Sequence, residues 1–352
     1  MEAFKQDVYT PEYATGFKIL GAKNAQSTLI QVSNPWQGAK NVTMSYFISR
    51  NGELPPQDSP DRPSPAGAQP HPYVCLPPTS PCSTPWDNVD RIVAVSGINY
   101  IANPYILAHK DSIKDMGPEM NYELLLGLKP DVVLLYGIGD AQTAVTDKLK
   151  ELAIPYMYVG EYLEESPLGK AEWLVALSEL TDSRDKGIDV FREIPKRYQA
   201  LKDLTASVEQ RPTVMFNTPW NDSWVMPSTQ SYMVQLVTDA GADYIYKENT
   251  SNSSAPIGLE TAYGLIQKAD YWINVGTAST LDELKNMNPK FADAKSVRDK
   301  TVYNNNLRIT ATGGNDYWES AVVRPDVVLR DLIHIFHPEL ISDSTYYYRH
   351  LE

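Results

Sequence analysis

The chain has 352 residues, more than one hydrophobic core usually organises, so its length predicts two domains. Asp and Glu number 44 against 31 Lys and Arg, and the formal net charge of -13 repels phosphate backbones and anionic membrane surfaces. The composition therefore argues against nucleic acid as a partner.

The two ends of the sequence give little information about export. No run approaches the roughly 18 to 20 apolar residues of a transmembrane helix, and the first ten residues lack the basic and apolar regions of a signal peptide. Met1-Glu2 is compatible with a vector start that replaces an export or lipoprotein signal, and Leu351-Glu352 resembles a cloning scar. We therefore treat residues 343–352 as a tail.

Residues 1–50 predict a small β-rich extension. The segments 17–22, 27–33 and 41–49 alternate in the manner of strands and are separated by turn signals. Residues 51–90 follow with eleven prolines, which remove backbone donors and speak against a helix or a central strand. We interpret this second segment as a linker or surface insertion.

The only two cysteines, Cys75 and Cys82, lie in the proline-rich segment. A disulfide across so short a loop would contribute roughly 2.5 kcal/mol and would imply an oxidising compartment. Two free thiols are the alternative, and the sequence does not choose between them.

An N-terminal α/β lobe is expected over residues 91–166. Apolar strands are predicted at 91–96, 131–138 and 154–160, with a helix at 141–152, and this alternation is typical of a parallel sheet covered by helices on both faces. A connecting helical segment, 167–208, follows.

Within that segment, apolar residues recur at steps of three or four from Ile188 to Leu204. A helix beginning near Arg184 would run roughly 30 to 35 Å, long enough to join two lobes. An ordinary core helix would show the same periodicity.

The α/β alternation restarts over residues 209–342, which we expect to form a C-terminal lobe. Strands are predicted at 212–218, 243–248, 270–276 and 301–306, and helices at 231–241, 259–268 and 325–336. An internal correspondence supports two halves, because Glu123 and Glu260 each lie near a helix start that precedes a Lys-x-Asp joint and an apolar strand. The fold class predicted is α/β, with two Rossmann-like lobes of mostly parallel sheet joined by one long interlobe helix.

The sequence lacks the usual signatures of nucleotide binding and hydrolysis. The patterns GxGxxG, GxxxxGK[ST], GxSxG and HExxH do not occur. His334 and His337 lie one helical turn apart, but no third ligand is recognisable, so we expect a surface or core pair and no metal bound directly by the protein. No cofactor is expected.

Aromatic side chains stand beside polar groups in segments that follow predicted strands. Ligands of open α/β sheets bind outside the carboxyl ends of strands, so these segments are expected to face one crevice. Aromatic faces suit a large, flat ligand and Arg308 suits a carboxylate, although any one of these aromatics could instead cover its own lobe. The candidate ligand-binding residues are Tyr100, Tyr136, Tyr162, Trp220, Trp224, Arg308, Asn315, Tyr317 and Trp318.

From about residue 90 to 340 the sequence resembles the ABC substrate-binding proteins for iron-siderophore, haem and cobalamin, whose two lobes are joined by one long helix. The segments that carry the resemblance are RIVAVS, NYELLLGLKPDVVLL, KLKELAIPYMYVGE, the helix after PLGKAEWL, RPTVMF, LVTDAGADYIY, LETAYGLIQKADYWI and RPDVVLRDLIHIFHPEL. The extension and the proline-rich segment fall outside the common core of this family.

The resemblance implies a periplasmic or lipid-anchored extracytoplasmic receptor that delivers a ferric siderophore, haem or a corrinoid to an ABC permease dimer. In such receptors one exposed glutamate on each lobe docks onto permease arginines, and Glu123 and Glu260 are the matching positions. At a helix start a carboxylate also serves as an ordinary dipole partner. We expect a monomer with no enzymatic activity.

Two other functions remain open. A two-lobed α/β transferase or chelatase could act in the same crevice, since fold alone does not decide function. Alternatively, the protein could be a surface module that recruits an outer-membrane partner through the extension and the proline-rich segment.

Overall fold

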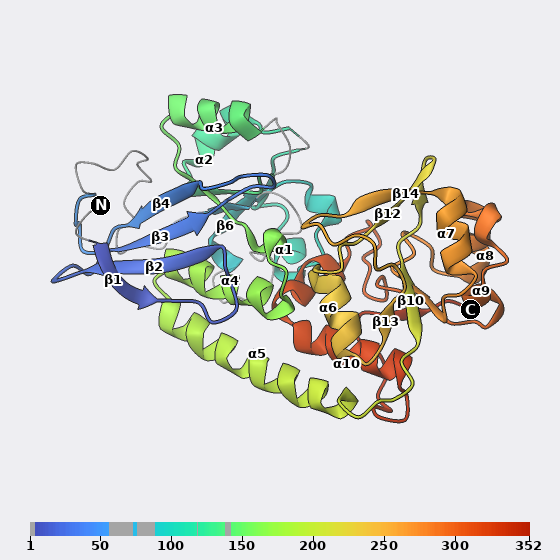
Figure 1. The fold of residues 1–352 in the computed structure, drawn as a ribbon. Coiled ribbons are helices and arrows are strands. Elements are labelled where there is room, and N and C mark those ends of the chain that lie inside the picture. Colours follow the sequence, from blue (N-terminus) through green and yellow to red (C-terminus); the bar gives the residue numbers. More distant parts are fainter. Residues whose placement is uncertain (1–3, 56–72, 76–88, 118, 138–141) are drawn as a thin grey trace. The chain divides into compact units, whose positions relative to one another are not determined.

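The computed structural model describes residues 4–55, 73–75, 89–117, 119–137 and 142–352 (Figure 1). The chain forms two compact units. Unit 1 comprises Met1–Glu164, Leu168–Arg192 and Thr310–Val323, and unit 2 comprises Glu165–Pro167, Glu193–Ile309 and Arg324–Glu352. The predicted α/β class with mostly parallel sheets is confirmed. The domain bounds predicted from the sequence stay predictions.

Unit 1 contains a five-stranded parallel sheet. Its order is β7-β6-β5-β8-β9, and its strands are β5 (Tyr73–Cys75), β6 (Ile92–Val95), β7 (Lys114–Asp115), β8 (Val132–Leu135) and β9 (Tyr156–Tyr158). The helices α1 (Pro104–Ala108), α2 (Tyr122–Leu128) and α3 (Gln142–Glu151) connect them. Asn103 and Asn121 cap the first two helices through their side-chain oxygens. The three strands predicted for this lobe are present.

Strand β5 corrects the view that residues 51–90 exclude a central strand. Tyr73–Cys75 lies between β6 and β8 and pairs with both. The prediction was wrong because it was based on the number of prolines in the whole segment. These three residues are not proline, so their backbone N–H groups remain able to join the ladder.

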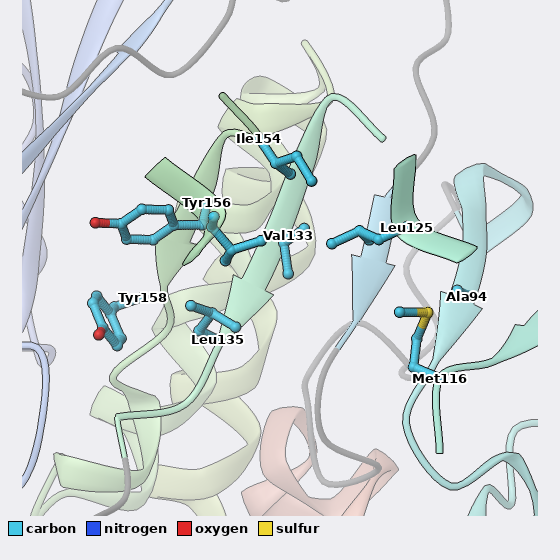
Figure 2. Packing of buried hydrophobic residues seen from close by; sticks show 9 residues of the cluster. Ala94, Met116, Leu125, Val133, Leu135, Ile154, Tyr156 and Tyr158 are labelled. Carbon is cyan, nitrogen blue, oxygen red and sulfur yellow. The ribbon is translucent and has the colours of Figure 1, made fainter. Parts of the chain in front are cut away.

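The core of this sheet is a continuous apolar cluster (Figure 2). Val133 and Leu135 on β8 lie beside Ile154 and the tyrosines of β9, and Leu125 of α2 reaches the same cluster. The buried members are Ala94, Met116, Leu125, Val133, Leu135, Leu149, Ile154, Tyr156 and Tyr158.

The N-terminal residues of unit 1 form a four-stranded antiparallel sheet in sequence order. Its strands are β1 (Phe4–Tyr9), β2 (Phe17–Ala22), β3 (Thr28–Ser33) and β4 (Thr43–Ile48). The sequence predicted the last three strands and missed β1, whose Lys5, Gln6 and Asp7 break the apolar pattern. The ring of Phe17 packs against Trp173 at 5.0 Å between centroids, so the sheet lies against α4 (Pro167–Leu180).

Helix α4 is buried around its whole circumference, as every residue from Gly169 to Leu180 is buried. It nevertheless carries Glu172 and Glu179, and buried carboxylates require partners. Glu172 accepts hydrogen bonds from the Tyr9 hydroxyl at 2.6 Å and from the backbone N–H groups of residues 12, 13 and 14 at 2.7 to 2.9 Å. Glu179 pairs with Arg50 and Arg184, each at 3.0 Å. The extension is therefore held to α4 by buried carboxylates.

Helix α5 (Arg184–Thr205) is the long helix that the sequence predicts. The segment predicted as one connection consists of two helices, because residues 181–183 separate α5 from α4. Residues up to Arg192 belong to unit 1 and those from Glu193 to unit 2. In unit 2 the Tyr198 hydroxyl donates to Asp239 at 2.8 Å and Lys202 pairs with the same carboxylate at 2.9 Å.

Unit 2 contains a second five-stranded sheet of order β13-β10-β15-β16-β17. The first four strands are parallel and are β10 (Thr213–Phe216), β13 (Asp243–Tyr244), β15 (Tyr271–Ile273) and β16 (Val302–Asn304). The strand predicted at 243–248 is only two residues long. A smaller antiparallel sheet is formed by β11 (Pro219–Trp220), β12 (Ser223–Met226) and β14 (Ala255–Gly258).

The helices of unit 2 are α6 (Tyr232–Asp239), α7 (Leu259–Ile266), α8 (Leu281–Met287), α9 (Lys295–Arg298) and α10 (Pro325–Phe336). The sequence predicted α6, α7 and α10 and missed the two short helices. Among the described residues, no helix is long and apolar enough to cross a membrane.

The last ten residues belong to this fold, which corrects their treatment as a tail. Strand β17 (Arg349–His350) pairs antiparallel with β16, and Leu351 is fully buried, with its N–H donating to the Val302 carbonyl at 3.0 Å. The buried carboxylate of Asp331 accepts hydrogen bonds from the N–H groups of Tyr346 and Tyr347 at 2.6 to 2.9 Å. The segment is thus anchored by apolar burial and by a carboxylate.

Candidate functional site

The carboxyl edge of the unit 1 sheet gathers three of the predicted tyrosines. Because parallel strands end at the same edge, residues after β6, β8 and β9 lie along one side of the sheet. Tyr100 ends the short 3-10 helix Ile98–Tyr100 after β6, Tyr136 follows β8, and Tyr162 lies in the 3-10 helix Glu161–Leu163 after β9. Three segments distant in sequence thus place aromatic side chains at one edge.

Tyr100 is held on a tight turn. Gly97 adopts a φ of 68°, a left-handed conformation that favours glycine, and its N–H donates to Asp115 at 2.9 Å. The N–H of Tyr100 donates to the Gly97 carbonyl at 2.8 Å, which closes the turn. The side chain of Tyr100 remains 64% exposed.

Residues 310–323 join this edge although they come from far along the chain. Glu319 is buried and accepts hydrogen bonds from the N–H groups of Ala102 and Asn103. Gly314 packs so closely that a Cβ there would lie 2.5 Å from the Ile101 carbonyl oxygen. The contacts fix this segment beside the turn that carries Tyr100.

Three predicted residues lie on that segment, and they differ in accessibility. Trp318 is 42% exposed, whereas Tyr317 is buried and packs edge-on against the Trp318 ring at 5.0 Å. The Asn315 side chain accepts a hydrogen bond from the Tyr317 N–H at 3.1 Å. Trp318 is therefore the side chain available to a ligand, and the other two hold its position.

A buried polar cluster of Tyr136, Glu161 and Lys170 lies near the ends of β8 and β9. The hydroxyl of Tyr136 donates to Glu161, whose second carboxylate oxygen is buried without a hydrogen-bond partner. Lys170 of α4 is also buried, and its Nζ donates to the Glu161 carbonyl oxygen at 3.3 Å. Burial raises the pKa of Glu161 to about 7, and the neighbouring Lys170 opposes the shift. Burial lowers the pKa of Lys170.

Tyr162 is half-buried and packs edge-on against Tyr136 at 5.2 Å. Its hydroxyl donates to the Gly137 carbonyl at 2.8 Å. Burial raises the pKa of Tyr162 to about 12, so the phenol stays neutral at physiological pH. Tyr136 therefore supports the Tyr162 ring, and Glu161 holds the Tyr136 hydroxyl.

In unit 2, the β11–β12 hairpin separates the two predicted tryptophans. Trp220 lies beside the turn and is 74% exposed. Trp224 is completely buried, packs against Phe291 at 5.0 Å and donates its indole N–H to the Phe216 carbonyl at 2.7 Å. Only Trp220 is accessible to a ligand, and Trp224 holds the hairpin to the core.

Arg308 follows β16 and is exposed, with its guanidinium carbon 4.2 Å from the centre of the Tyr346 ring. Arg324 stacks on the same ring at 4.6 Å. Asp331 fixes the Tyr346 backbone, and the Tyr346 ring in turn orders the guanidinium groups of Arg308 and Arg324. This arrangement suits a ligand that carries carboxylate groups.

The remainder of the unit 2 edge is lined by asparagines. The Asn304 amide donates to the carbonyls of Gly276 and Ala278 at 2.9 and 2.8 Å, and the Asn217 amide donates to Val225 at 2.9 Å. These bonds fix the loops after β15 and β10. The sequence reasoning did not assign a role to these residues, although an asparagine run after a strand is a visible signal.

A sequence profile described as periplasmic binding protein matches residues 85–306, which is more than half of the chain. The chain belongs to the periplasmic binding protein family.

Two relatives of this periplasmic binding protein are uncharacterized lipoproteins of Methanocaldococcus jannaschii. One is 27% identical over 222 residues, which are 62% of this chain and 51% of the relative. The other is 25% identical over 241 residues, which are 65% of this chain and 59% of the relative. The chain thus spans between half and three fifths of the length of these two relatives.

Solved structures share its fold at low sequence identity. A periplasmic heme binding protein from Pseudomonas aeruginosa gives a TM-score of 0.62 at 15% identity, covering 80% of this chain and 98% of that one. A periplasmic binding protein from Veillonella parvula gives 0.61 at 15% identity, covering 89% and 99%. The heme-binding protein RhuT from Roseiflexus gives 0.59 at 14% identity, covering 77% and 99%.

The two glutamates predicted to dock on a permease lie in the first turns of α2 and α7 of this periplasmic binding protein. Both Glu123 and Glu260 are exposed, and neither carboxylate has a hydrogen bond or ion pair among the described residues. Their docking role stays a prediction.

The histidine pair is used inside the fold. His334 bonds the Ile341 carbonyl at 2.8 Å and His337 bonds the Gly241 carbonyl at 2.9 Å, each through one ring nitrogen. Cys82 and the side chain of Cys75 lie outside the described residues, so the disulfide stays a prediction.

Proposed function

We propose that this protein is the extracytoplasmic solute receptor of an ABC importer and that it captures an iron chelate (a ferric siderophore or haem) or a cobalamin-type corrinoid. The observation that carries the proposal is the presence of exposed aromatic side chains in each unit: Tyr100 and Trp318 in unit 1, and Trp220 on the β11–β12 hairpin of unit 2. We propose that residues of both units contact the ligand. The shared crevice predicted from the sequence stays a prediction.

The chemistry of these residues favours a large ligand with a flat or apolar face and peripheral acids. Exposed indole and phenol rings contribute apolar area with few rotatable bonds. Arg308 and Arg324, ordered on Tyr346, supply cations for carboxylates. Two structures with the same fold are described as heme-binding proteins, which supports this ligand class without choosing among its members.

Delivery to the permease is the second half of the proposal. The carboxylates of Glu123 and Glu260 are exposed and have no partner among the described residues, so they can meet cationic groups on a permease dimer. We propose that the receptor works as a monomer outside the cytoplasm. A lipid anchor fits the lipoprotein names of two relatives.

The enzyme alternative would need an acid or base that reaches a substrate. Glu161 has a pKa of about 7, yet its side chain is only 2% exposed and is engaged by Tyr136. A group so enclosed serves structure better than proton transfer to a bound molecule. We therefore favour the receptor.

A ligand panel tests the proposal. Ferric siderophores, haem and cobalamins would be titrated with tryptophan quenching and thermal shift as independent readouts, with each metal-free siderophore as its control. The chain has seven tryptophans, so quenching is sensitive. We expect one ligand class to quench and to stabilise the protein. If no member does either, the proposed function is wrong.

A further inference from the structure

The N-terminal antiparallel sheet carries none of the candidate ligand-binding residues. Its strands β3 and β4 are joined by a short loop that contains Pro35, Trp36 and Gln37. This loop extends to the same edge of the unit 1 parallel sheet that carries Tyr162, as its contacts with the end of β8 and with β9 show.

The contact with β8 is a backbone contact. Trp36 forms a parallel bridge with Gly137, which lies two residues beyond the end of β8. A Cβ at Gly137 would lie 2.3 Å from the Trp36 Cβ, so only glycine allows this approach. The Trp36 ring also packs on Tyr158 of β9 at 5.3 Å. The loop is therefore continuous with the strand ends of the parallel sheet.

The loop also contacts a candidate ligand-binding residue. The backbone N–H of Gln37 lies near the Tyr162 hydroxyl. That hydroxyl donates to the Gly137 carbonyl at 2.8 Å. One phenol thus links the N-terminal loop to the end of β8. The side chain of Gln37 is exposed.

The sheet that carries this loop is anchored on both sides of the loop, by buried carboxylates that bind the chain before β2 and by a contact of β4 with β9. Glu172 binds three successive backbone N–H groups before β2, and Glu164 binds the N–H groups of Thr15 and Gly16 at 2.9 to 3.0 Å. The Tyr46 hydroxyl of β4 accepts a hydrogen bond from the Tyr158 N–H at 3.2 Å. The loop therefore belongs to an anchored sheet within unit 1.

We propose that Gln37 is a specificity-determining residue, whose side-chain amide contacts a polar group on the periphery of the captured ligand. A primary amide both donates and accepts hydrogen bonds, so it suits a peripheral carboxamide, hydroxyl or carboxylate. This inference rests on the proposed function. It gives the N-terminal sheet a part in ligand choice.

The test compares the affinities of Gln37→Ala, Gln37→Glu and Gln6→Ala for each ligand of the panel that wild type binds. Gln6 is a matched control, because it is an exposed glutamine on β1 of the same sheet. We expect Gln37→Ala to weaken the preferred ligand about five- to tenfold, the effect of one or two hydrogen bonds. Gln37→Glu should weaken carboxylate-bearing ligands more than carboxamide-bearing ligands. Thermal midpoints without ligand should match wild type.

Affinities of both Gln37 variants equal to wild type would overturn the inference while leaving the proposed function standing. An equal loss for all ligands together with a lower thermal midpoint would also overturn it, because a structural defect explains that pattern. If wild type binds no ligand of the panel, the proposed function fails and this inference fails with it.

Discussion

The two parallel sheets have similar strand arrangements, but their carboxyl edges are built differently. In unit 1 the edge is completed by segments from elsewhere in the chain, namely the loop around Trp36 and residues 310–323. Buried carboxylates such as Glu319 hold these segments. In unit 2 the loops belong to the sheet itself, and neutral amides such as that of Asn304 fix them.

This difference predicts which changes destabilise each unit. A buried carboxylate loses its function when a partner is removed or when its charge changes, whereas an asparagine amide does not titrate. Unit 1 should therefore respond to pH and to charge substitutions. In unit 2 the loops that Asn304 fixes should respond less to pH, although this unit also contains the buried carboxylates Asp239 and Asp331.

The largest effect is expected for Trp224→Ala in unit 2. Trp224 is completely buried, and removing a buried tryptophan costs about 3 to 5 kcal/mol. Trp220→Ala is the matched control on the same hairpin, and its 74% exposure predicts a change within about 0.5 kcal/mol. Urea denaturation checks both, and similar destabilisation of the two variants would contradict the assignment of their roles.

Glu172→Ala is expected to have the next largest effect. It leaves the Tyr9 hydroxyl and the N–H groups of residues 12–14 without their acceptor, a loss of about 3 kcal/mol. Exposed Glu165 provides the control, and Glu165→Ala should leave the unfolding midpoint unchanged. A Glu172→Ala variant as stable as wild type would mean that the Glu172 hydrogen bonds are not needed to hold the N-terminal sheet.

The pH dependence of unit 1 should trace to Glu161. Because its pKa is raised from 4.5 to about 7 in the folded protein, its contribution to stability is present below about pH 4.5 and is lost as the pH rises through 7. From pH 5 to pH 8 this loss amounts to roughly 3 kcal/mol at most. In Glu161→Gln the loss disappears, and stability stays level or rises with pH because buried Lys170 more easily becomes neutral.

Denaturation of wild type and Glu161→Gln at pH 5 and pH 8 measures this difference. Equal pH slopes for the two proteins would show that Glu161 does not titrate in this range.

Docking substitutions are expected to have the smallest effects. Glu123→Ala in unit 1 and Glu260→Ala in unit 2 should each weaken binding to the cognate permease about three- to tenfold. Each substitution removes one proposed ion pair between the receptor and the permease. Ligand affinity should remain that of wild type. Permease binding measured in detergent or nanodiscs tests this prediction. A loss of binding in only one of the two variants would contradict the proposal that both glutamates dock on the permease.

The fold could largely be predicted from the sequence, because apolar runs such as β8 and the stripe of α5 are local signals. Strand β5 could not be predicted, because the prolines on both sides of its three residues argue against a strand. The candidate site could be predicted from the sequence only in part. The sequence gives residue types but not burial, so it could not distinguish Trp220 from Trp224.

Long-range hydrogen bonds explain the other omissions. Nothing near Gln37 in the sequence indicates its contact with Tyr162, which is separated from it by more than a hundred residues. The glutamates of α4 did carry a signal, because a charged residue within an apolar helix requires a partner. The sequence does not say which partner.

The most direct measurement is a titration of the best-bound panel ligand against Trp318→Ala from unit 1 and Trp220→Ala from unit 2. The account predicts that each variant binds about tenfold more weakly than wild type while unfolding at the wild-type midpoint, because both side chains are exposed aromatic contacts from different units. Wild-type affinity in both variants would contradict the claim that exposed aromatics of the two units hold the ligand.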